Sequence, residues 1–384
     1  MSGSYYIGVS RFRRPTSCGS LLFAVLAIGA GDRTPATPEQ YPGAARQDAT
    51  ASRAPWSSTL AWATTLPARP VGHGTADGDR IYVPLEGDRL AAIDRDTGAV
   101  RWTAMHDGLS SPVAAPGAVW ITTSDGLLAL DAGTGTQRHR VPLPIPASGP
   151  LSRMGDLLLV PLESGDLWAL DSDARVAWRR LLRAPSRIGA AAGDDGILAV
   201  VQSGGGLVAL DAGTGEVLWT RSIGGALTAP IIAGGRVLIG SNPDAFYAFH
   251  ARSGRLGWVW PTGSDVVGAA AGGGAVYVAS LDNVIRALDI ARGHLRWKQV
   301  STTRPVSPPL RAGTWLFVAG ARPAITVYDT ASNGAPHQLA LPQELSRAVF
   351  AGAPIVLPGP EPSLARMVVV ARDGRVVALD TELP

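Results

Sequence analysis

Short runs of apolar residues recur along the chain from residue 58 to the end, separated by segments rich in Gly, Pro and Asp. In one stretch this pattern predicts β-strands at residues 100–104, 112–115, 118–123 and 127–131. The dipeptides Pro116-Gly117 and Asp125-Gly126 lie between predicted strands and are typical of tight turns. Apolar residues are continuous rather than alternating at 127–130, as in a strand that is covered on both faces. The pattern therefore predicts an all-β protein.

The strand pattern repeats with a period of about 40 residues, which is typical of propellers, solenoids and other repeat arrays. Two clear copies are AIDRDTGAVRW at 92–102 and ALDAGTGEVLW at 209–219. The position of the first Asp recurs as Asp94, Asp131, Asp171, Asp211, His250, Asp289, Asp329 and Asp380. The Trp position recurs as Trp62, Trp102, His139, Trp178, Trp219, Trp258 and Trp297, and is lost near His337. Four strands in each repeat indicate propeller blades rather than a helical array.

Eight repeats of four strands predict an eight-bladed β-propeller of four-stranded antiparallel blades over residues 58–384. The last repeat ends without a Trp strand, whereas an extra strand with Trp62 precedes the first complete set. We therefore expect the N-terminal strand at 58–64 to pair with the C-terminal strand at 376–380 in one blade. Such pairing closes the ring and removes the exposed edges of the sheets.

The repeat motif has a structural explanation. Its Asp can accept hydrogen bonds from backbone N–H groups two or three residues further on, and so stabilise a turn. Gly98, Gly135 and Gly215 supply the positive φ that a side chain would oppose. The Trp offers a large flat surface to a neighbouring blade and an indole N–H that needs an acceptor. A calcium loop beginning at Asp94 is the alternative, but the Glu that would complete such a loop is missing.

The N-terminal segment has the order of a secretory signal peptide. Arg11, Arg13 and Arg14 precede the apolar run 21–28, and small residues follow at 29–31. We predict a signal peptide at 1–30, a disordered tether rich in Pro, Ala, Thr and Arg at 31–57, and an exported protein. A buried N-terminal helix is the alternative. The apolar run is too short to span a membrane, and Cys18 precedes it, where a lipid cannot be attached to an exported chain.

The amino-acid composition and the absence of known motifs exclude several classes of fold and function. With 46 Gly and 30 Pro among 384 residues, a helical bundle is excluded. The net charge of +3 equals the contribution of the three Arg residues before position 15, so the propeller is neutral and nucleic acid is not an expected partner. A single Cys excludes an internal disulfide. We find no motif of a metalloprotease, a serine hydrolase or a phosphate-binding loop, and we expect no catalytic residue, no cofactor, no metal and a monomeric state.

The interval between Asp329 and Asp380 is longer than the others by about eleven residues. It contains Pro354, Pro358, Pro360 and Pro362, so a Pro-rich insertion is expected near 351–363. A rigid loop of this kind can bind a ligand, and a neutral insertion is the alternative.

The repeated Ala-x-Asp-x-x-Thr-Gly-x-x-x-Trp motif resembles that of the PQQ-binding-like β-propeller family. Within it, the chain is most similar to the branch of the outer-membrane protein assembly factor BamB. Members of that branch are non-catalytic scaffolds, and a Leu-x-Leu-Arg stretch after one Trp strand contacts their barrel-assembly partner. Here Leu182 and Arg183 match this stretch, whereas Arg180 replaces its first Leu. The resemblance thus implies that Leu182 and Arg183 bind a partner protein in the periplasm or cell envelope, with an ordinary solvated loop as the alternative.

A second branch of the family consists of PQQ-dependent dehydrogenases, which use a quinone and calcium. Those enzymes are longer than this chain, and many carry a disulfide of neighbouring cysteines beside the quinone. We find no acidic cluster here apart from the repeat positions. The sequence therefore favours a protein-interaction scaffold, with a PQQ-dependent or other small-molecule-binding protein as the alternative.

Overall fold

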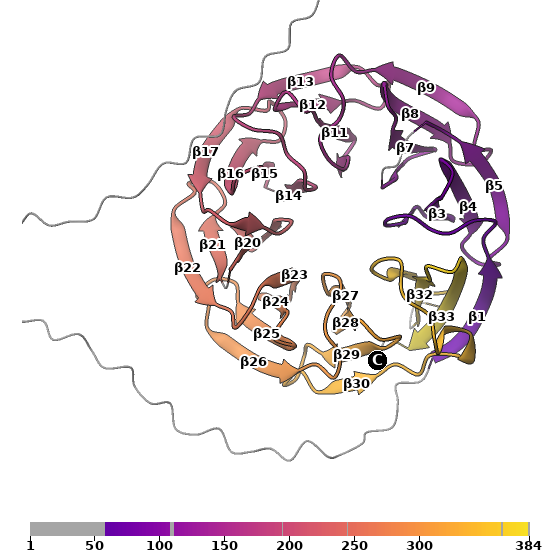
Figure 1. The fold of residues 1–384 in the computed structure, drawn as a ribbon. Helices are drawn as coiled ribbons and strands as arrows, with labels where there is room; N and C mark the ends of the chain where they lie inside the picture. The colour runs from indigo at the N-terminus through magenta and orange to yellow at the C-terminus, as the bar shows by residue number, and fades with distance from the viewer. Residues whose placement is uncertain (1–57, 108–110, 194, 244, 362–363, 383–384) are drawn as a thin grey trace, which may run out of the picture. The chain divides into compact units, whose positions relative to one another are not determined.

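A computed structural model describes residues 58–107, 111–193, 195–243, 245–361 and 364–382. These residues form eight antiparallel sheets arranged radially in a ring (Figure 1). The prediction of an eight-bladed β-propeller is confirmed. The predicted signal peptide and tether, at 1–30 and 31–57, lie outside the described residues.

The strands of each blade are given from the innermost to the outermost, and in six of the eight blades the innermost strand is shorter than the outermost. Blades 1 to 4 consist of β2 (Thr75–Ala76), β3 (Arg80–Leu85), β4 (Arg89–Asp94) and β5 (Val100–Met105); β6 (Val113–Ala115), β7 (Ala118–Thr122), β8 (Gly126–Asp131) and β9 (Gln137–Pro142); β10 (Ser152–Met154), β11 (Leu157–Pro161), β12 (Asp166–Leu170) and β13 (Val176–Leu181); β14 (Ala191–Ala192), β15 (Ile197–Gln202), β16 (Gly206–Asp211) and β17 (Val217–Ser222). The strands predicted between residues 100 and 131 agree with β5, β6, β7 and β8 to within about one residue at each end.

The second half of the ring has the same order, except that blade 5 has a divided innermost strand and blade 8 contains strands from both ends of the described chain. Blades 5 to 8 consist of β18 (Ala226–Leu227), β19 (Ile231–Ala233), β20 (Arg236–Asn242), β21 (Ala245–His250) and β22 (Leu256–Pro261); β23 (Val266–Gly272), β24 (Ala275–Ser280), β25 (Val284–Asp289) and β26 (Leu295–Val300); β27 (Leu310–Ala312), β28 (Trp315–Ala319), β29 (Ile325–Asp329) and β30 (Pro336–Gln338); β31 (Ile355–Pro358), β32 (Leu364–Val370), β33 (Arg375–Glu382) and β1 (Ser58–Thr65). In blade 5 the innermost strand is in two pieces, β18 and β19, because Pro230 between them has no N–H to donate.

The ring closes in blade 8, as predicted. β1 pairs antiparallel with β33, from Ser58 opposite Thr381 to Thr65 opposite Arg375. In Figure 1 the indigo β1 lies beside the yellow β33, so the two ends of the described chain complete one sheet. Blade 8 thus combines one N-terminal strand with three C-terminal strands. The ring cannot open without breaking the hydrogen bonds between β1 and β33, which would also expose two strand edges.

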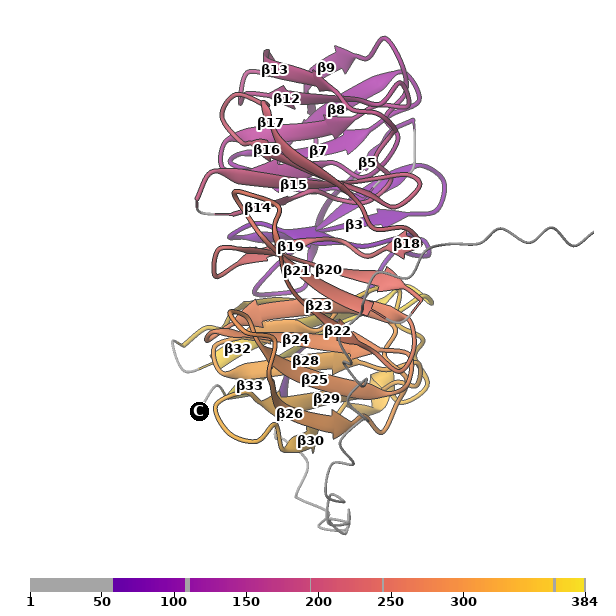
Figure 2. The same ribbon diagram turned by 90° about the vertical axis from the view of Figure 1, so that its left-hand side faces the viewer.

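The core lies between neighbouring blades, whose sheets face each other in the side view of Figure 2. Both middle strands of a blade are covered on both faces, and in blade 1 Ile81, Tyr82, Ala91 and Ala92 are all fully buried. This burial explains the continuous apolar runs in the sequence. A small residue lies opposite the Trp of the outermost strand in most blades, as Ala209 does to Trp219, and leaves room for the indole on the shared face.

The extra length of the last repeat is divided between two places. The connection from β30 to β31 contains the 3-10 helix η1 (Gln343–Leu345), and the β31–β32 hairpin takes the remainder. Leu345 and Ala348 are buried in the core shared by blades 7 and 8, so this insertion is anchored to the ring. Pro358 is the last residue of β31 rather than part of a loop. The Pro-rich insertion predicted near 351–363 is therefore only partly a loop, because strand β31 lies within it.

Candidate functional site

The motif residues hold neighbouring blades together. Six Trp side chains each lie against a Gly in the hairpin between the third and outermost strands of the next blade: Trp62 on Gly98, Trp102 on Gly135, Trp178 on Gly215, Trp219 on Gly254, Trp258 on Gly293 and Trp297 on Gly334. A Cβ on any of these Gly residues would lie 2.4–2.6 Å from the nearest indole atom. Five of the indole N–H groups also donate to a carbonyl in the same hairpin, at 2.6–3.1 Å. Gly is thus required here by its neighbour as well as by its φ of +63° to +74°.

The Asp of the motif caps the same hairpin. Asp211 Oδ1 accepts the N–H groups of Gly213 and Thr214 at 3.0 and 2.9 Å. Equivalent bonds from N–H groups two to four residues further on end on Asp94, Asp131, Asp171, Asp289 and Asp329. These donors lower the pKa of Asp211, the backbone N–H of Thr214 contributing most. The carboxylates accept these internal donors and so cap the turn, as the motif predicts.

His139 and His250 are two of the repeat positions that depart from this scheme. His139 replaces a Trp, and the hairpin that it faces in blade 3 has Ala174, at a φ of +65°, instead of the Gly. At the equivalent Gly of six other blades a Cβ would clash with the facing Trp, so His at position 139 and Ala at position 174 are consistent with each other. His250 replaces an Asp and contacts Arg255 at 2.8 Å, and burial together with Arg236 and Arg255 lowers the pKa of its ring.

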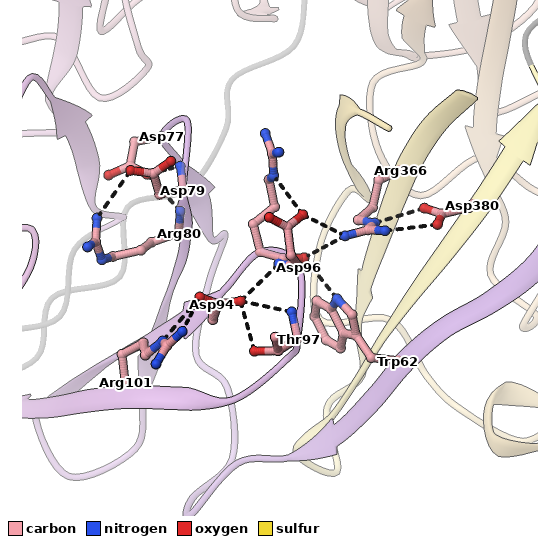
Figure 3. A network of polar contacts seen from close by, with 11 residues as sticks. Trp62, Asp77, Asp79, Arg80, Asp94, Asp96, Thr97, Arg101, Arg366 and Asp380 are labelled. Atoms are coloured by element: carbon pink, nitrogen blue, oxygen red, sulfur yellow. Dashed lines mark hydrogen bonds and ion pairs between the residues drawn. The ribbon is translucent and has the colours of Figure 1, made fainter. Parts of the chain in front are cut away.

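Asp380 occupies an Asp position of the repeat but caps no turn, because β33 continues through it to Glu382. Figure 3 shows what it does instead: both carboxylate oxygens accept hydrogen bonds from Arg366, each at 2.8 Å. Arg366 also donates to Asp96 Oδ1 at 2.9 Å and to the Arg95 carbonyl at 3.1 Å, in the β4–β5 hairpin. This cluster, in which the side chain of Arg366 is 6% exposed and that of Asp96 is 65% exposed, joins blade 8 to blade 1 at the closing seam. Its sequence signal is an Arg within the apolar strand 364–370.

The motif hairpins, between the third and outermost strands, lie on one face of the ring. The other face, which we call the bracket face, carries the connections between blades and the hairpins between the two middle strands of each blade. A backbone hydrogen bond of 2.8–3.1 Å recurs on it, from the hairpin to a carbonyl of the preceding connection. The pairs are Glu86 N with Arg69 O, Ser124 N with Asp107 O, Glu163 N with Pro146 O, Ser203 N with Pro185 O, Leu281 N with Asp265 O, Ala321 N with Arg304 O, and Arg372 N with Val349 O. The same backbone frame thus presents different side chains around the ring.

The segment 180–183 lies on the bracket face between blades 3 and 4, and its side chains alternate in role. Arg180 Nε donates to the Gly215 carbonyl at 2.6 Å. Leu182 is only 7% exposed, packs in the core with Leu159 and Leu167, and bonds through its N–H to the Gly165 carbonyl at 2.8 Å. Leu181 is 69% exposed, and Arg183 is also exposed. Of the two residues predicted to bind a partner, Arg183 is accessible, whereas Leu182 anchors the connection.

The described part of the chain contains no group of three or more His, Cys, Asp or Glu that could hold a metal ion. The repeat carboxylates lie in seven different blades, because His250 takes this position in blade 5. Within the same residues, no helix is long and apolar enough to cross a membrane.

Comparison with known proteins places the chain in a family. The family model described as outer membrane protein assembly factor BamB matches residues 45–190, 172–304 and 282–383. BamB of Yersinia pestis is 29% identical over 199 residues, 46% of this chain and 50% of that protein. Polyvinylalcohol dehydrogenase of a Sphingopyxis species is 29% identical over 178 residues, 42% of this chain and 24% of that protein. The matched region thus spans half of the assembly factor and a quarter of the dehydrogenase.

A solved structure agrees with the fold. The crystal structure of BamB from Moraxella catarrhalis has a TM-score of 0.63 to this chain at 19% sequence identity, and the match covers 84% of this chain and 99% of that one. Together with the family model, which extends over most of the residues, these findings confirm the family expected from the repeat motif. The chain belongs to the family of the outer membrane protein assembly factor BamB.

Proposed function

We propose that this protein is a non-catalytic scaffold that binds a protein partner during the assembly of outer-membrane β-barrel proteins, and that it works in the cell envelope. The observation that carries this proposal is the match of the BamB family model over residues 45–383. The proposal includes export through the predicted signal peptide and a protein that takes no cofactor.

The geometry of the bracket face supports this role. Its connections are held by repeated backbone hydrogen bonds, so exposed side chains such as Leu181 and Arg183 are presented on a rigid frame. A preformed surface loses little conformational entropy when a partner binds. An exposed Leu beside an exposed Arg also combines an apolar anchor with a charge that can select an acidic neighbour.

The relative that is a polyvinylalcohol dehydrogenase supports a second candidate, a quinone-dependent enzyme. Calcium would need several carboxylate ligands close together, and the carboxylates of the motif are instead bound by the N–H groups of their own hairpins. A rise in melting temperature and reduction of a redox dye on adding PQQ and calcium would favour this candidate over the scaffold.

Changing Leu181 and Arg183 to acidic residues is expected to remove the partner without unfolding the ring. Both side chains point away from the core, so the variant Leu181→Asp/Arg183→Glu should keep the melting temperature of the wild type. Its recovery of barrel-assembly proteins, in affinity capture from envelope membranes with quantitative mass spectrometry, should fall at least tenfold.

A matched control lies at the other end of the same strand. Val176 is exposed, and the side chain of the exposed Arg175 pairs with the exposed Asp173, so Arg175→Glu/Val176→Asp makes the same charge change on the opposite face. This control should capture the partner normally. Full recovery by the Leu181/Arg183 variant, or equal loss in the control, would contradict the proposed contact.

A further inference from the structure

The long connection between β30 and β31 forms one wall of a pocket. It has a volume of about 630 Å³ and lies on the bracket face at the junction of blades 8 and 1. Its walls come from the segment 69–72, the anchored insertion 347–351 and the β32–β33 hairpin, with Glu86 from the β3–β4 hairpin. The volume is within the range of sites that bind organic ligands or short peptide segments, and is many times that of one water molecule.

The pocket carries an excess of positive charge. Arg69, Arg347 and Arg372 line it, all three are exposed, and none of their side chains forms a hydrogen bond or ion pair with another described residue. Of the two acidic residues in the wall, Asp373 is bound by Arg375 at 2.6 Å, which leaves Glu86 against three guanidinium groups.

Two other arginines on the bracket face, unlike those of the pocket, have acidic partners. Arg140 pairs with Asp125 at 2.7 Å, and Arg187 with Glu163 at 2.9 Å. The three arginines of the pocket are therefore available to a ligand, and each can bind a carboxylate through two parallel hydrogen bonds.

The walls are also partly apolar and held in place. Val349 is 55% exposed and lines the pocket with Val71 and Ala351. The carbonyls of Arg69 and Val349 accept the recurrent backbone bonds, each at 2.8 Å, and the Ala351 N–H donates to the Val370 carbonyl at 2.8 Å. A single phosphate or carboxylate would leave this apolar wall and most of the volume unused.

We propose that this basic pocket binds an acidic segment of a protein partner, in which carboxylates alternate with apolar side chains. The carboxylates pair with Arg69, Arg347 and Arg372, and an apolar side chain covers Val349. The proposal deepens the scaffold function and rests on it for the identity of the partner. The binding chemistry itself depends only on the pocket.

The test is a titration of the purified protein with a fluorescein-labelled peptide of alternating Glu and Val, followed by fluorescence anisotropy. We expect saturable binding that weakens as salt increases. In the variant Arg347→Glu/Arg372→Glu the dissociation constant should rise at least tenfold, because two attractive contacts become repulsive. A peptide with Lys in place of Glu should not bind.

Blade 7 offers a matched control, because Arg304 and Arg322 are exposed on the same face outside the pocket. Arg304→Glu/Arg322→Glu should bind the acidic peptide within about twofold of the wild type. Equal weakening in both variants, or no binding of the peptide by the wild type, would overturn the proposal. Binding of inorganic phosphate or of phosphatidylglycerol vesicles without binding of the peptide would also overturn it, and would assign the arginines to a phosphate group.

The titration separates this inference from the scaffold function. If the wild type binds the peptide but captures no barrel-assembly protein, the scaffold proposal fails and the pocket remains. If capture succeeds and no peptide binds, the pocket proposal fails alone.

Discussion

Replacing Arg366 with methionine is expected to lower the free energy of unfolding by about 3–5 kcal/mol, because the change leaves a buried carboxylate without its partner. The Arg366 side chain is 6% exposed, and the Asp380 that it binds is 12% exposed. Arg366 also donates to Asp96 and to the Arg95 carbonyl in blade 1, so the variant loses contacts across the seam as well as within blade 8. Urea denaturation monitored by Trp fluorescence measures the loss.

An exposed pair provides the control for this prediction. Arg101 binds Asp94 at 2.7 Å, but its side chain is 53% exposed, and Arg101→Met should cost no more than about 1 kcal/mol. Arg366→Met combined with Asp380→Leu should recover part of the stability, because no buried charge is then unpaired. If Arg366→Met costs no more than Arg101→Met, the seam does not depend on this ion pair.

Replacing Gly215 with alanine is expected to cost about 2–5 kcal/mol, the sum of a backbone penalty and a steric one. Gly215 has a φ of +69°, and the new Cβ would lie 2.4 Å from Trp178 Cε3. The indole is itself buried and bonded to the Ala212 carbonyl at 3.1 Å, so it cannot move away freely. The same denaturation experiment measures this change.

Gly196 separates the two contributions. Its φ is +73°, and no atom of the described residues lies within 4 Å of the place that a Cβ would take, other than its chain neighbours. Gly196→Ala should therefore cost only the backbone penalty, about 1–2 kcal/mol. Equal losses in the two variants would show that the Trp178 contact does not constrain position 215.

Much of the fold could be predicted because the turns and strands of each repeat are determined by residues within that repeat. The Asp and Gly of the motif act on their own hairpin, so their conformational roles follow from neighbours along the chain. The partner of Trp178 in the next blade could not be predicted, because the contact with Gly215 joins two repeats. Closure through β1 was predictable, because the first repeat has an extra strand and the last repeat lacks one. Pairing these two ends is the arrangement that leaves no strand edge exposed.

The candidate site was less predictable, because its residues make contacts with other repeats. Leu182 matches a family motif, but its burial depends on the core between blades 3 and 4. Asp380 occupies an Asp position of the repeat, yet it binds Arg366, which lies fourteen residues before it. The basic pocket gathers Arg69 and Arg372 from opposite ends of the chain, and only ring closure brings them together.

The proposed scaffold function requires that the bracket face near Leu181 contacts a barrel-assembly protein. Site-specific photo-crosslinking in cells tests it most directly, with the photoreactive residue at position 181 and, as a control, at position 176 on the same strand. If the protein is such a scaffold, we expect a crosslink from position 181 to an outer-membrane assembly protein and none from position 176. No crosslink from position 181, or the same products from both positions, would contradict it.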